Sequence, residues 1–420
     1  MAVQVLNHKA KGRRKVMKKG RSGLILLLAG TLCLMVTGVW AADVRGVTDT
    51  EVKIACLVDL SGPGKYGGPP IVDAFKDYVA WFNDKGGTHG RKITLIVEDN
   101  GILPNTTLNA AKKVILKDEV FAIGFNLGSA GSSAILPLCE ENQAVLMPHG
   151  ANKEFYSPGN KWVFVPHTVQ YDMAARAVEY VLGKNPKARI GMIYQDDAFG
   201  REGLEGARAA ARFMKTRVDA EAPYKIGTID FTPHMNAMKE AKVDWIVLWT
   251  YLPQSAAVIK EKVKLGWDVG LISNNTTGVP PLFALVGESA DGYLLVTPYA
   301  PGHMDLPGVK RVKEVAKKYG NFEKTLGNPM YPDYLYLAAW GYIEAMGEGL
   351  KKAGKNLTPD TFVKGLESIK DHDMGGLCPN ITFGPNRHVS SFSSLVLRAD
   401  GKKKQFVIAD PISEPKSIKK

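Results

Sequence analysis

Residues 52–68 read VKIACLVDLSGPGKYGG, a strand-length apolar run that ends in a glycine-rich loop. Apolar runs of the same length predict further strands at 93–97, 121–125 and 144–147, with helical patterns between them. The helix expected at 106–117 places Leu108, Ala111 and Ile115 on one face. Alternating strands and helices are typical of a parallel sheet covered by helices, so the predicted fold class is α/β.

A second α/β series follows the first. Strands are expected at 189–194, 244–249, 271–272 and 292–296, a short extended piece near Ile226, and helices at 200–216, 234–241 and 255–265. Beyond Thr297 the pattern predicts helices at 309–319, 334–353 and 359–369, then a hairpin of 395–398 and 405–409 joined through Asp400-Gly401. This tail is too helical for a third α/β unit, so we expect it to pack onto the first two.

The charge of the chain is concentrated at its start. The 420 residues contain 54 Lys and Arg against 42 Asp and Glu, a formal charge of +12, but eight of the basic residues precede Leu24, where no acidic residue occurs. Without those eight, 46 basic residues face 42 acidic ones, which leaves +4. A nucleic-acid partner is therefore not expected.

The basic start runs into an apolar run of thirteen residues, Leu24 to Val36, broken by Gly30 and Thr31, and then into small residues. This order is typical of a secretory signal peptide, and Val39 and Ala41 suit the positions before a cleavage site, so residues 1–41 are predicted to be removed on export to the periplasm. The alternative is an uncleaved membrane anchor. A membrane-spanning helix needs about 20 apolar residues, which this run does not reach.

Three cysteines remain after the predicted cleavage site: Cys56, Cys139 and Cys378. An odd number in an oxidising compartment leaves at least one thiol free or paired between chains. The sequence contains no Cys-x-x-Cys or His-Glu-x-x-His, so neither a metal nor another cofactor is expected.

Three loops follow strands of the first series at the carboxyl edge of the sheet, where open α/β sheets bind ligands. The loop at 59–68 lacks the spacing of a phosphate-binding loop, and a plain tight turn is its alternative. The second loop, GFNLGSAGSS at 124–133, opens a helix, with Ser129 or Ser132 as the expected N-cap. A serine and free N–H groups at a helix start favour a carboxylate ligand, although an ordinary capped helix is the alternative. The third loop is 147–152.

The first α/β unit resembles the type I periplasmic solute-binding proteins of the branched-chain amino acid ABC importers. The resemblance lies in VKIACLVDLSGPGKYGG (52–68) and in WFNDKGGTHGRKITLIVEDNGILPNTTLNAAKKVI (81–115). It continues through IGMIYQDDAFGREG (190–203), IDFTPHMNAMKEAKVDWIVL (229–248) and ADGYLLVTPYAP (290–301), and so covers nearly all of the predicted mature chain.

This resemblance implies a two-lobed fold with three crossover strands as hinge, and a solute bound in the cleft for delivery to an inner-membrane permease. It places lobe 1 at 43–165 and 298–376, lobe 2 at 166–297 and 377–411, and a basic tail at 412–420. A monomer is expected. In the family, lobe 1 holds the ligand carboxylate, and the matching positions here are Ser129, His149 and Ala151.

The sequence departs from the family where an amino acid's ammonium group would bind. The tyrosine of the family's Tyr-Gly loop is Phe199 here, and an ungapped count puts Asn275 at the acidic position. An unpaired buried ammonium is unfavourable by several kcal/mol. We therefore expect a carboxylic acid without an α-amino group. The family's frequent disulfide is also missing, since Ile102 and Gly128 stand at its two positions.

Aromatic residues expected near the cleft would suit a flat ring, which favours an aromatic acid. An amino acid binder, a sensory ligand-binding domain and an enzyme are the alternatives. The enzyme has little support, because no Gly-x-Ser-x-Gly elbow occurs. His167 is a further possible partner for a carboxylate or phenol. The candidate ligand-binding residues are Tyr66, Asn126, Ser129, His149, Ala151, Phe199, Trp249, Tyr251, Asn275 and Tyr331.

Overall fold

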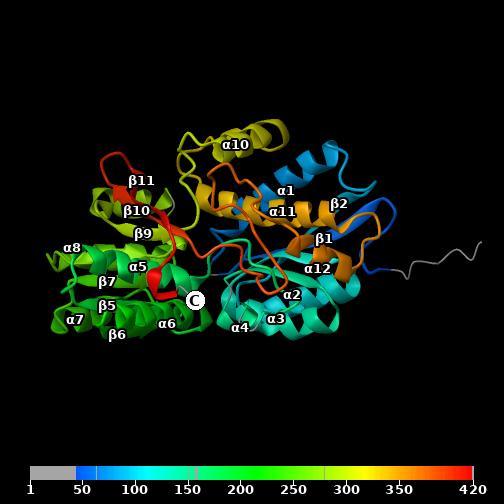
Figure 1. The fold of residues 1–420 in the computed structure, drawn as a ribbon. Coiled ribbons are helices and arrows are strands. Elements are labelled where there is room, and N and C mark those ends of the chain that lie inside the picture. Colours follow the sequence, from blue (N-terminus) through cyan, green and yellow to red (C-terminus); the bar gives the residue numbers. More distant parts are fainter. Residues whose placement is uncertain (1–43, 63, 151, 157–158, 279, 419–420) are drawn as a thin grey trace, which may run out of the picture. The chain divides into compact units, whose positions relative to one another are not determined.

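The computed structural model describes residues 44–420 with gaps at 63, 151, 157–158, 279 and 419–420. The predicted signal segment, 1–41, lies outside the described residues. The predicted lobe boundaries stay a prediction, and the lobes are named below by their sheets. In the described part, each of two mainly parallel sheets carries helices on its faces (Figure 1), which confirms the predicted two-lobed α/β class.

Lobe 1 is built on a four-stranded parallel sheet with the order β2-β1-β3-β4. Its strands are β1 (Glu51–Val58), β2 (Lys92–Asp99), β3 (Ala122–Leu127) and β4 (Val145–His149). The central strands β1 and β3 are buried almost throughout because helices cover both faces. Its helical elements are α1 (Gly68–Asp84), α2 (Pro104–Lys112), a π-helical turn η1 (Lys113–Lys117), α3 (Ser129–Glu141), α4 (Lys153–Tyr156), α10 (Pro307–Tyr319), η4 (Phe322–Lys324), α11 (Asp333–Ala353) and α12 (Pro359–Glu367).

Lobe 2 is built on a seven-stranded sheet with the order β11-β10-β9-β8-β7-β5-β6. Its strands are β5 (Ile190–Gln195), β6 (Val218–Tyr224), β7 (Trp245–Trp249), β8 (Gly270–Ser273), β9 (Leu294–Thr297), β10 (Ser394–Asp400) and β11 (Gln405–Ser413). Its helical elements are α5 (Gln170–Lys184), α6 (Ala198–Phe213), α7 (Thr232–Glu240), α8 (Leu252–Lys264), η2 (Asn275–Thr277), α9 (Pro281–Val286), η3 (Gly287–Ala290) and η5 (Lys416–Ile418).

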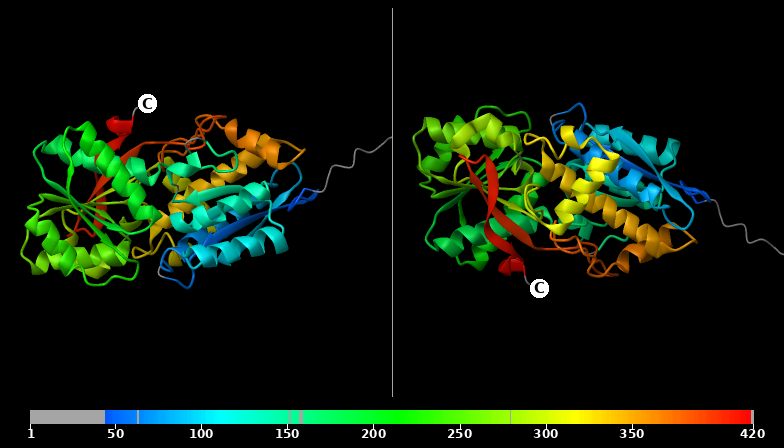
Figure 2. Two further views of the ribbon diagram at one scale, coloured as in Figure 1. Left: turned by 90° about the horizontal axis from the view of Figure 1, so that it is seen from below. Right: turned by 90° about the horizontal axis from the view of Figure 1, so that it is seen from above.

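The C-terminal part of the chain returns to both lobes, as the sequence predicts. Helix α11 packs against α1 and α12 of lobe 1. The hairpin β10–β11 joins the sheet of lobe 2 by antiparallel pairing of β10 with β9, and Figure 2 shows it as the red ribbon on that lobe. No third α/β unit forms in the described chain.

Three segments connect the lobes: 150–169, 298–306 and 368–393. The first and third pair with each other, because Val165 donates its N–H to His388 O at 2.8 Å and accepts from Ser390 N at 2.9 Å. The second is tied to the third by Ala300 N and Leu377 O at 2.8 Å. The connections therefore lie side by side and can bend together as one hinge.

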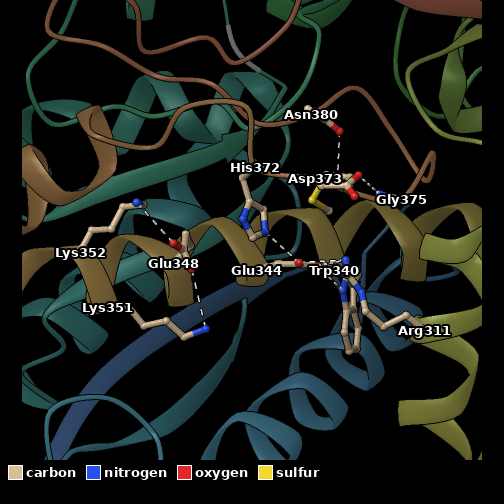
Figure 3. Close-up of polar contacts among 11 residues, drawn as sticks. Arg311, Trp340, Glu344, Glu348, Lys351, Lys352, His372, Asp373, Gly375 and Asn380 are labelled. Atoms are coloured by element: carbon tan, nitrogen blue, oxygen red, sulfur yellow. Dashed lines mark hydrogen bonds and ion pairs between the residues drawn. The ribbon is translucent and has the colours of Figure 1, made fainter.

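A buried polar cluster ties α10, α11 and the loop after α12 together (Figure 3). Glu344, on α11, accepts hydrogen bonds from Trp340 Nε1 at 2.7 Å and from Arg311 at 2.9 and 3.0 Å, and its Oε1 lies 3.0 Å from His372 Nε2. The carboxylate is almost fully buried, so these partners replace its lost hydration. The cluster thus fixes α11, whose first turn reaches the site described below.

The structure corrects some of the predicted element boundaries. The extended piece expected near Ile226 is β6, which ends at Tyr224, while Ile226 lies in the following turn and is exposed. The helix expected at 200–216 is α6, which begins after Asp197 because this side chain accepts a hydrogen bond from Gly200 N at 3.1 Å. It ends at Phe213, since Lys215 has a positive φ.

The expected capping of α3 by Ser129 or Ser132 is wrong. Gly128 is the N-cap, with a φ of 104° that favours glycine, and no side chain caps this helix. Ser132 Oγ instead donates to Gly128 O at 2.9 Å and accepts from Asn126 Nδ2 at 2.8 Å. Ser129 is therefore the first helical residue, and its hydroxyl is not used as a cap.

All three cysteines of the described chain are free and buried, in agreement with the expected unpaired thiol. Burial raises the pKa of each thiol above its usual value. Ile102 and Gly128 adjoin one another, since a Cβ on Gly128 would lie 2.8 Å from Ile102 Cγ1. An apolar contact therefore stands at the two positions where the family resemblance expects a disulfide.

Candidate functional site

The cleft cavity is a small space enclosed by residues of both lobes. Its volume is about 20 Å³, which is room for about one water molecule. Lobe 1 contributes the loops after β1 and β2, the start of α3, the end of β4 and the first turn of α11, and lobe 2 the starts of α5, α6 and α8 and the turn η2. The lining residues are Gly64, Tyr66, Gly67, Ile102, Leu127, Gly128, Ser129, His149, Gly150, Gln170, Phe199, Tyr251, Thr276 and Leu335.

Ser129 is the most informative residue of the cleft cavity. It is 3% exposed, and its Oγ has no hydrogen-bond partner among the described residues. Gly150 lies so close that a Cβ there would be 2.5 Å from this Oγ, and its φ of 106° favours glycine. Because buried hydroxyls are normally paired, and the first N–H groups of a helix are free, this corner suits an anionic acceptor.

His149 lies beside Ser129 at the end of β4 and is neutral at physiological pH. Burial lowers the pKa of its imidazole to about 3, and the neighbouring His167 ring contributes. Burial likewise lowers the pKa of His167 to about 4. The His149 ring stacks on Phe125, with centroids 5.2 Å apart. It can therefore bind an acid through a neutral N–H, but it supplies no positive charge before a ligand is bound.

Aromatic rings form the lobe 2 side of the cleft cavity. Phe199 and Tyr251 stack with centroids 5.1 Å apart and an interplanar angle of 18°. From lobe 1, Tyr66 lines the same cavity. A hydrogen bond between the lobes runs from Tyr156 OH to Glu202 Oε1 at 3.0 Å. The described structure is thus a closed arrangement with an aromatic wall.

A larger space, the hinge cavity, lies next to the cleft cavity. Its volume is about 290 Å³, and its lining includes Asn275, Tyr331, Asp333 and Tyr334. Asn275 Nδ2 donates to Tyr334 OH, and the same hydroxyl lies 3.4 Å from His149 Nε2. Asn275 Oδ1 is buried and has no partner in the described chain. A chain of polar contacts thus runs from the hinge cavity to the cleft cavity.

The structure brings half of the predicted site residues together. Tyr66, Ser129, His149, Phe199 and Tyr251 line the cleft cavity, whereas Asn275 and Tyr331 line the hinge cavity.

Trp249 and Asn126 line neither cavity. Trp249 is buried behind Phe199. Asn126 is buried and hydrogen-bonded to Asn100 and Ser132. Ala151 lies outside the described residues.

Gln170 and Thr276 are site residues that the sequence analysis missed. Gln170, the first residue of α5, is 2% exposed, and its Oε1 has no partner among the described residues. Thr276 follows Asn275 in η2 and faces the cleft cavity. The only available signal was their position: Gln170 begins the first helix after a crossover, and Thr276 stands beside a residue already singled out.

We expect His149 to make the ligand-free protein less stable in acid. Burial lowers the pKa of His149 in the folded protein to about 3, whereas its pKa in the unfolded chain is about 6.5, so the unfolded chain binds the proton more readily. The contribution of neutral His149 to the free energy of unfolding is therefore fully present above about pH 6.5 and is lost as the pH falls toward 3. From pH 7 to pH 5 the lost free energy of unfolding is about 2 kcal/mol. Urea unfolding of wild type and His149→Gln at both pH values measures it as a difference.

The comparison with the variant is needed because two buried acids change the free energy of unfolding with pH in the opposite direction to His149. Burial raises the pKa of Asp77 and that of Asp333 to about 6, so they favour the folded state at low pH and lose this contribution as pH rises. Both acids remain in His149→Gln and cancel in the difference. Equal pH dependence of the two proteins would contradict a buried neutral His149.

None of the described helices is long and apolar enough to cross a membrane. No group of three or more His, Cys, Asp or Glu side chains within the described ranges is placed to hold a metal ion.

Known proteins are similar to this chain in sequence and in fold. The profile of the periplasmic binding protein family matches residues 51–404. The Leu/Ile/Val/Thr-binding protein of Salmonella typhimurium is 25% identical over 276 residues, 65% of this chain and 73% of that protein. A fatty acid ABC transporter substrate-binding protein from Thermomonospora curvata has a TM-score of 0.80 at 24% identity, over 90% of this chain and 96% of that one.

Two further solved structures carry other ligands. A branched-chain amino acid ABC transporter protein from Thermus thermophilus with bound valine has a TM-score of 0.79 at 21% identity, covering 88% of this chain and 98% of that one. A solute-binding protein from R. palustris in complex with 4-hydroxybenzoate has a TM-score of 0.75 at 16% identity, covering 88% and 99%. At these identities the likeness to solved structures shows the fold alone.

The chain belongs to the periplasmic binding protein family, because the family profile covers most of its length. Within it, the relatives are the Leu/Ile/Val-binding proteins of ABC transporters, so the resemblance seen in the sequence is confirmed. These relatives are periplasmic proteins that bind solutes and are not enzymes.

Proposed function

We propose that this protein binds a small carboxylic acid without an α-amino group, with an aromatic acid as the favoured ligand, and delivers it as a monomer to an inner-membrane ABC permease. The carboxylate binds at the start of α3, where Ser129 Oγ and the free helix N–H groups meet it, with the neutral His149 beside them. The aromatic pair Phe199 and Tyr251 packs against the part of the ligand next to its carboxylate.

The observation that carries this proposal is the charge of the cleft cavity. None of the described residues that line it is Asp or Glu, and Phe199 presents no hydroxyl. A ligand carboxylate has unpaired donors at Ser129, whereas an ammonium has no carboxylate to pair with there. An unpaired buried charge is unfavourable by several kcal/mol, so the site favours acids over amino acids.

The fatty acid and 4-hydroxybenzoate named for two proteins of the same fold are acids without an α-amino group, which supports the proposal in general terms. Export through a signal peptide at 1–41, cleaved after Ala41, is part of the same proposal. N-terminal sequencing of protein isolated from the periplasm should start at or near Ala42, and an intact N-terminus would contradict it.

The experiment that tests the proposal compares acids with their amides. Thermal unfolding is followed with benzoate and benzamide, and with cinnamate and cinnamide, at equal concentrations. Ligand at 100 times its dissociation constant raises the free energy of unfolding by about 2.7 kcal/mol, so at least one acid should raise the melting temperature while its amide does not. Equal shifts for acid and amide would show that no carboxylate site exists.

A further inference from the structure

The two cavities differ greatly in size, and the smaller one has the unpaired hydroxyl of Ser129 and the unpaired amide oxygen of Gln170. The cleft cavity, at about 20 Å³, holds a water but no ring, whereas ligand pockets usually measure about 300 Å³ or more. The hinge cavity, at about 290 Å³, nearly reaches that size. A carboxylate bound at Ser129 therefore needs space that lies outside the cleft cavity.

Asn275 and Tyr334 border the hinge cavity next to residues that line the cleft cavity, and this pair is called the partition below. Both line the hinge cavity, while the residues that follow them, Thr276 and Leu335, line the cleft cavity. They come from different lobes, Asn275 from η2 and Tyr334 from α11, and they are joined by a side-chain hydrogen bond. A ligand that extends from the cleft cavity into the hinge cavity therefore has to pass beside or between these two side chains.

The partition is built from groups that can change partners. Asn275 Oδ1 already lacks a partner in the described chain, and the Tyr334 hydroxyl lies a long 3.4 Å from His149 Nε2. When a ligand separates Asn275 from Tyr334, the tyrosine hydroxyl can turn to His149 or to the ligand carboxylate. The lost hydrogen bond is thus replaced at the same hydroxyl.

The hinge cavity suits an apolar tail. Buried Phe283, Leu295, Leu397 and Phe406 form part of its lining, and Leu326 is half-buried there. Exposed lysines of the β10–β11 turn also line it, and their positive charge favours the approach of an anionic ligand. Asp333 and Asn275 also line the cavity, so it is the apolar part of the wall that matches the hydrocarbon part of an extended acid.

We propose that the ligand is an elongated acid whose carboxylate binds at Ser129 and whose hydrocarbon tail passes between Asn275 and Tyr334 into the hinge cavity. This inference rests on the proposed function, because it uses the same carboxylate position. It assigns the hinge cavity as the tail subsite and favours arylalkanoic acids over benzoate.

The test is calorimetry with a series of acids that differ only in length: benzoate, phenylacetate, 3-phenylpropanoate and 4-phenylbutanoate. Each buried methylene should tighten binding about fourfold, so 4-phenylbutanoate should bind at least tenfold more tightly than benzoate. This comparison uses the wild-type chain and does not depend on how a variant folds. Equal or weaker binding of the longer acids would overturn the tail subsite.

A pair of variants locates the tail. Leu326→Trp, which fills the hinge cavity, should weaken 4-phenylbutanoate at least tenfold and change benzoate less than twofold. The matched control is Leu116→Trp, at an exposed position that lines neither cavity, and it should change neither acid. Unchanged 4-phenylbutanoate binding in a folded Leu326→Trp would also overturn the subsite.

Ser129→Ala separates the two proposals. It should weaken every acid of the series, because all share the carboxylate. If it weakens the acids but length has no effect, the proposed function stands and the tail subsite is wrong. If no acid of the series binds, or if Ser129→Ala changes none of them, the carboxylate site itself is wrong and the tail subsite fails with it.

Discussion

Replacement of Ser129 by alanine should weaken binding of the acid ligand by one to two decades. The Oγ of Ser129 is buried and unpaired among the described residues, so we expect it to donate to the charged carboxylate of the proposed ligand. A hydrogen bond to a charged group contributes about 1.5 to 3 kcal/mol, and about 1.4 kcal/mol is a tenfold change in affinity. Isothermal titration of wild type and variant with the tightest acid of the series measures the difference.

The matched control is Ser132→Ala, one turn further along the same helix. The Ser132 hydroxyl is satisfied within the protein by Gly128 O and Asn126 Nδ2, so its removal should lower stability and leave acid affinity nearly unchanged. Should Ser129→Ala bind as tightly as wild type, the carboxylate position at α3 would be wrong. A similar loss of affinity in both variants would point to a general disturbance of the helix.

Trp340→Ala should lower the free energy of unfolding by about 3 to 5 kcal/mol, as expected for a large ring removed from a core. Trp340 is 1% exposed, packs edge-on against Tyr78 with centroids 5.2 Å apart, and donates its Nε1 hydrogen to Glu344 at 2.7 Å. The substitution leaves a cavity between α1 and α11 and takes one partner from a buried carboxylate. Urea unfolding measures the effect.

Trp267→Ala is the comparison for Trp340→Ala, because Trp267 is only half-buried and follows α8 in lobe 2. It should destabilise the protein much less. Similar losses for both variants would contradict the assignment of Trp340 to the core that holds α11. Since the first turn of α11 includes Tyr334 and Leu335, Trp340→Ala should also weaken ligand binding in the fraction that stays folded.

The order of strands and helices was predictable from the sequence because buried parallel strands are continuous apolar runs, as in β1 and β7. Helix starts were predicted two to three residues late at α2, α7, α8 and α10. In each of these helices a proline stands in the first or second helical position, where its missing N–H is not needed. The edge strand β6 was predicted too late in the chain, near Ile226, because charged residues interrupt its apolar pattern.

The site was predictable only where the sequence shows a loop at the carboxyl edge of a sheet. Ser129, His149 and Phe199 follow this rule and line the cleft cavity. Gln170 also lines the cleft cavity but does not follow this rule, because its position depends on how a crossover segment enters the other lobe. The partition of Asn275 and Tyr334 joins residues 59 positions apart in the chain and on different lobes, so no local pattern could reveal it.

The most direct test of the central claim compares acids that differ only in the α-amino group. Calorimetry is performed with leucine and 4-methylpentanoate, and with phenylalanine and 3-phenylpropanoate. The cleft cavity has no described carboxylate to pair with an ammonium, so the amino-free acid of a pair should bind at least a hundredfold more tightly, and leucine, isoleucine and valine should give no measurable heat. Micromolar or tighter binding of leucine, isoleucine or valine would contradict the account.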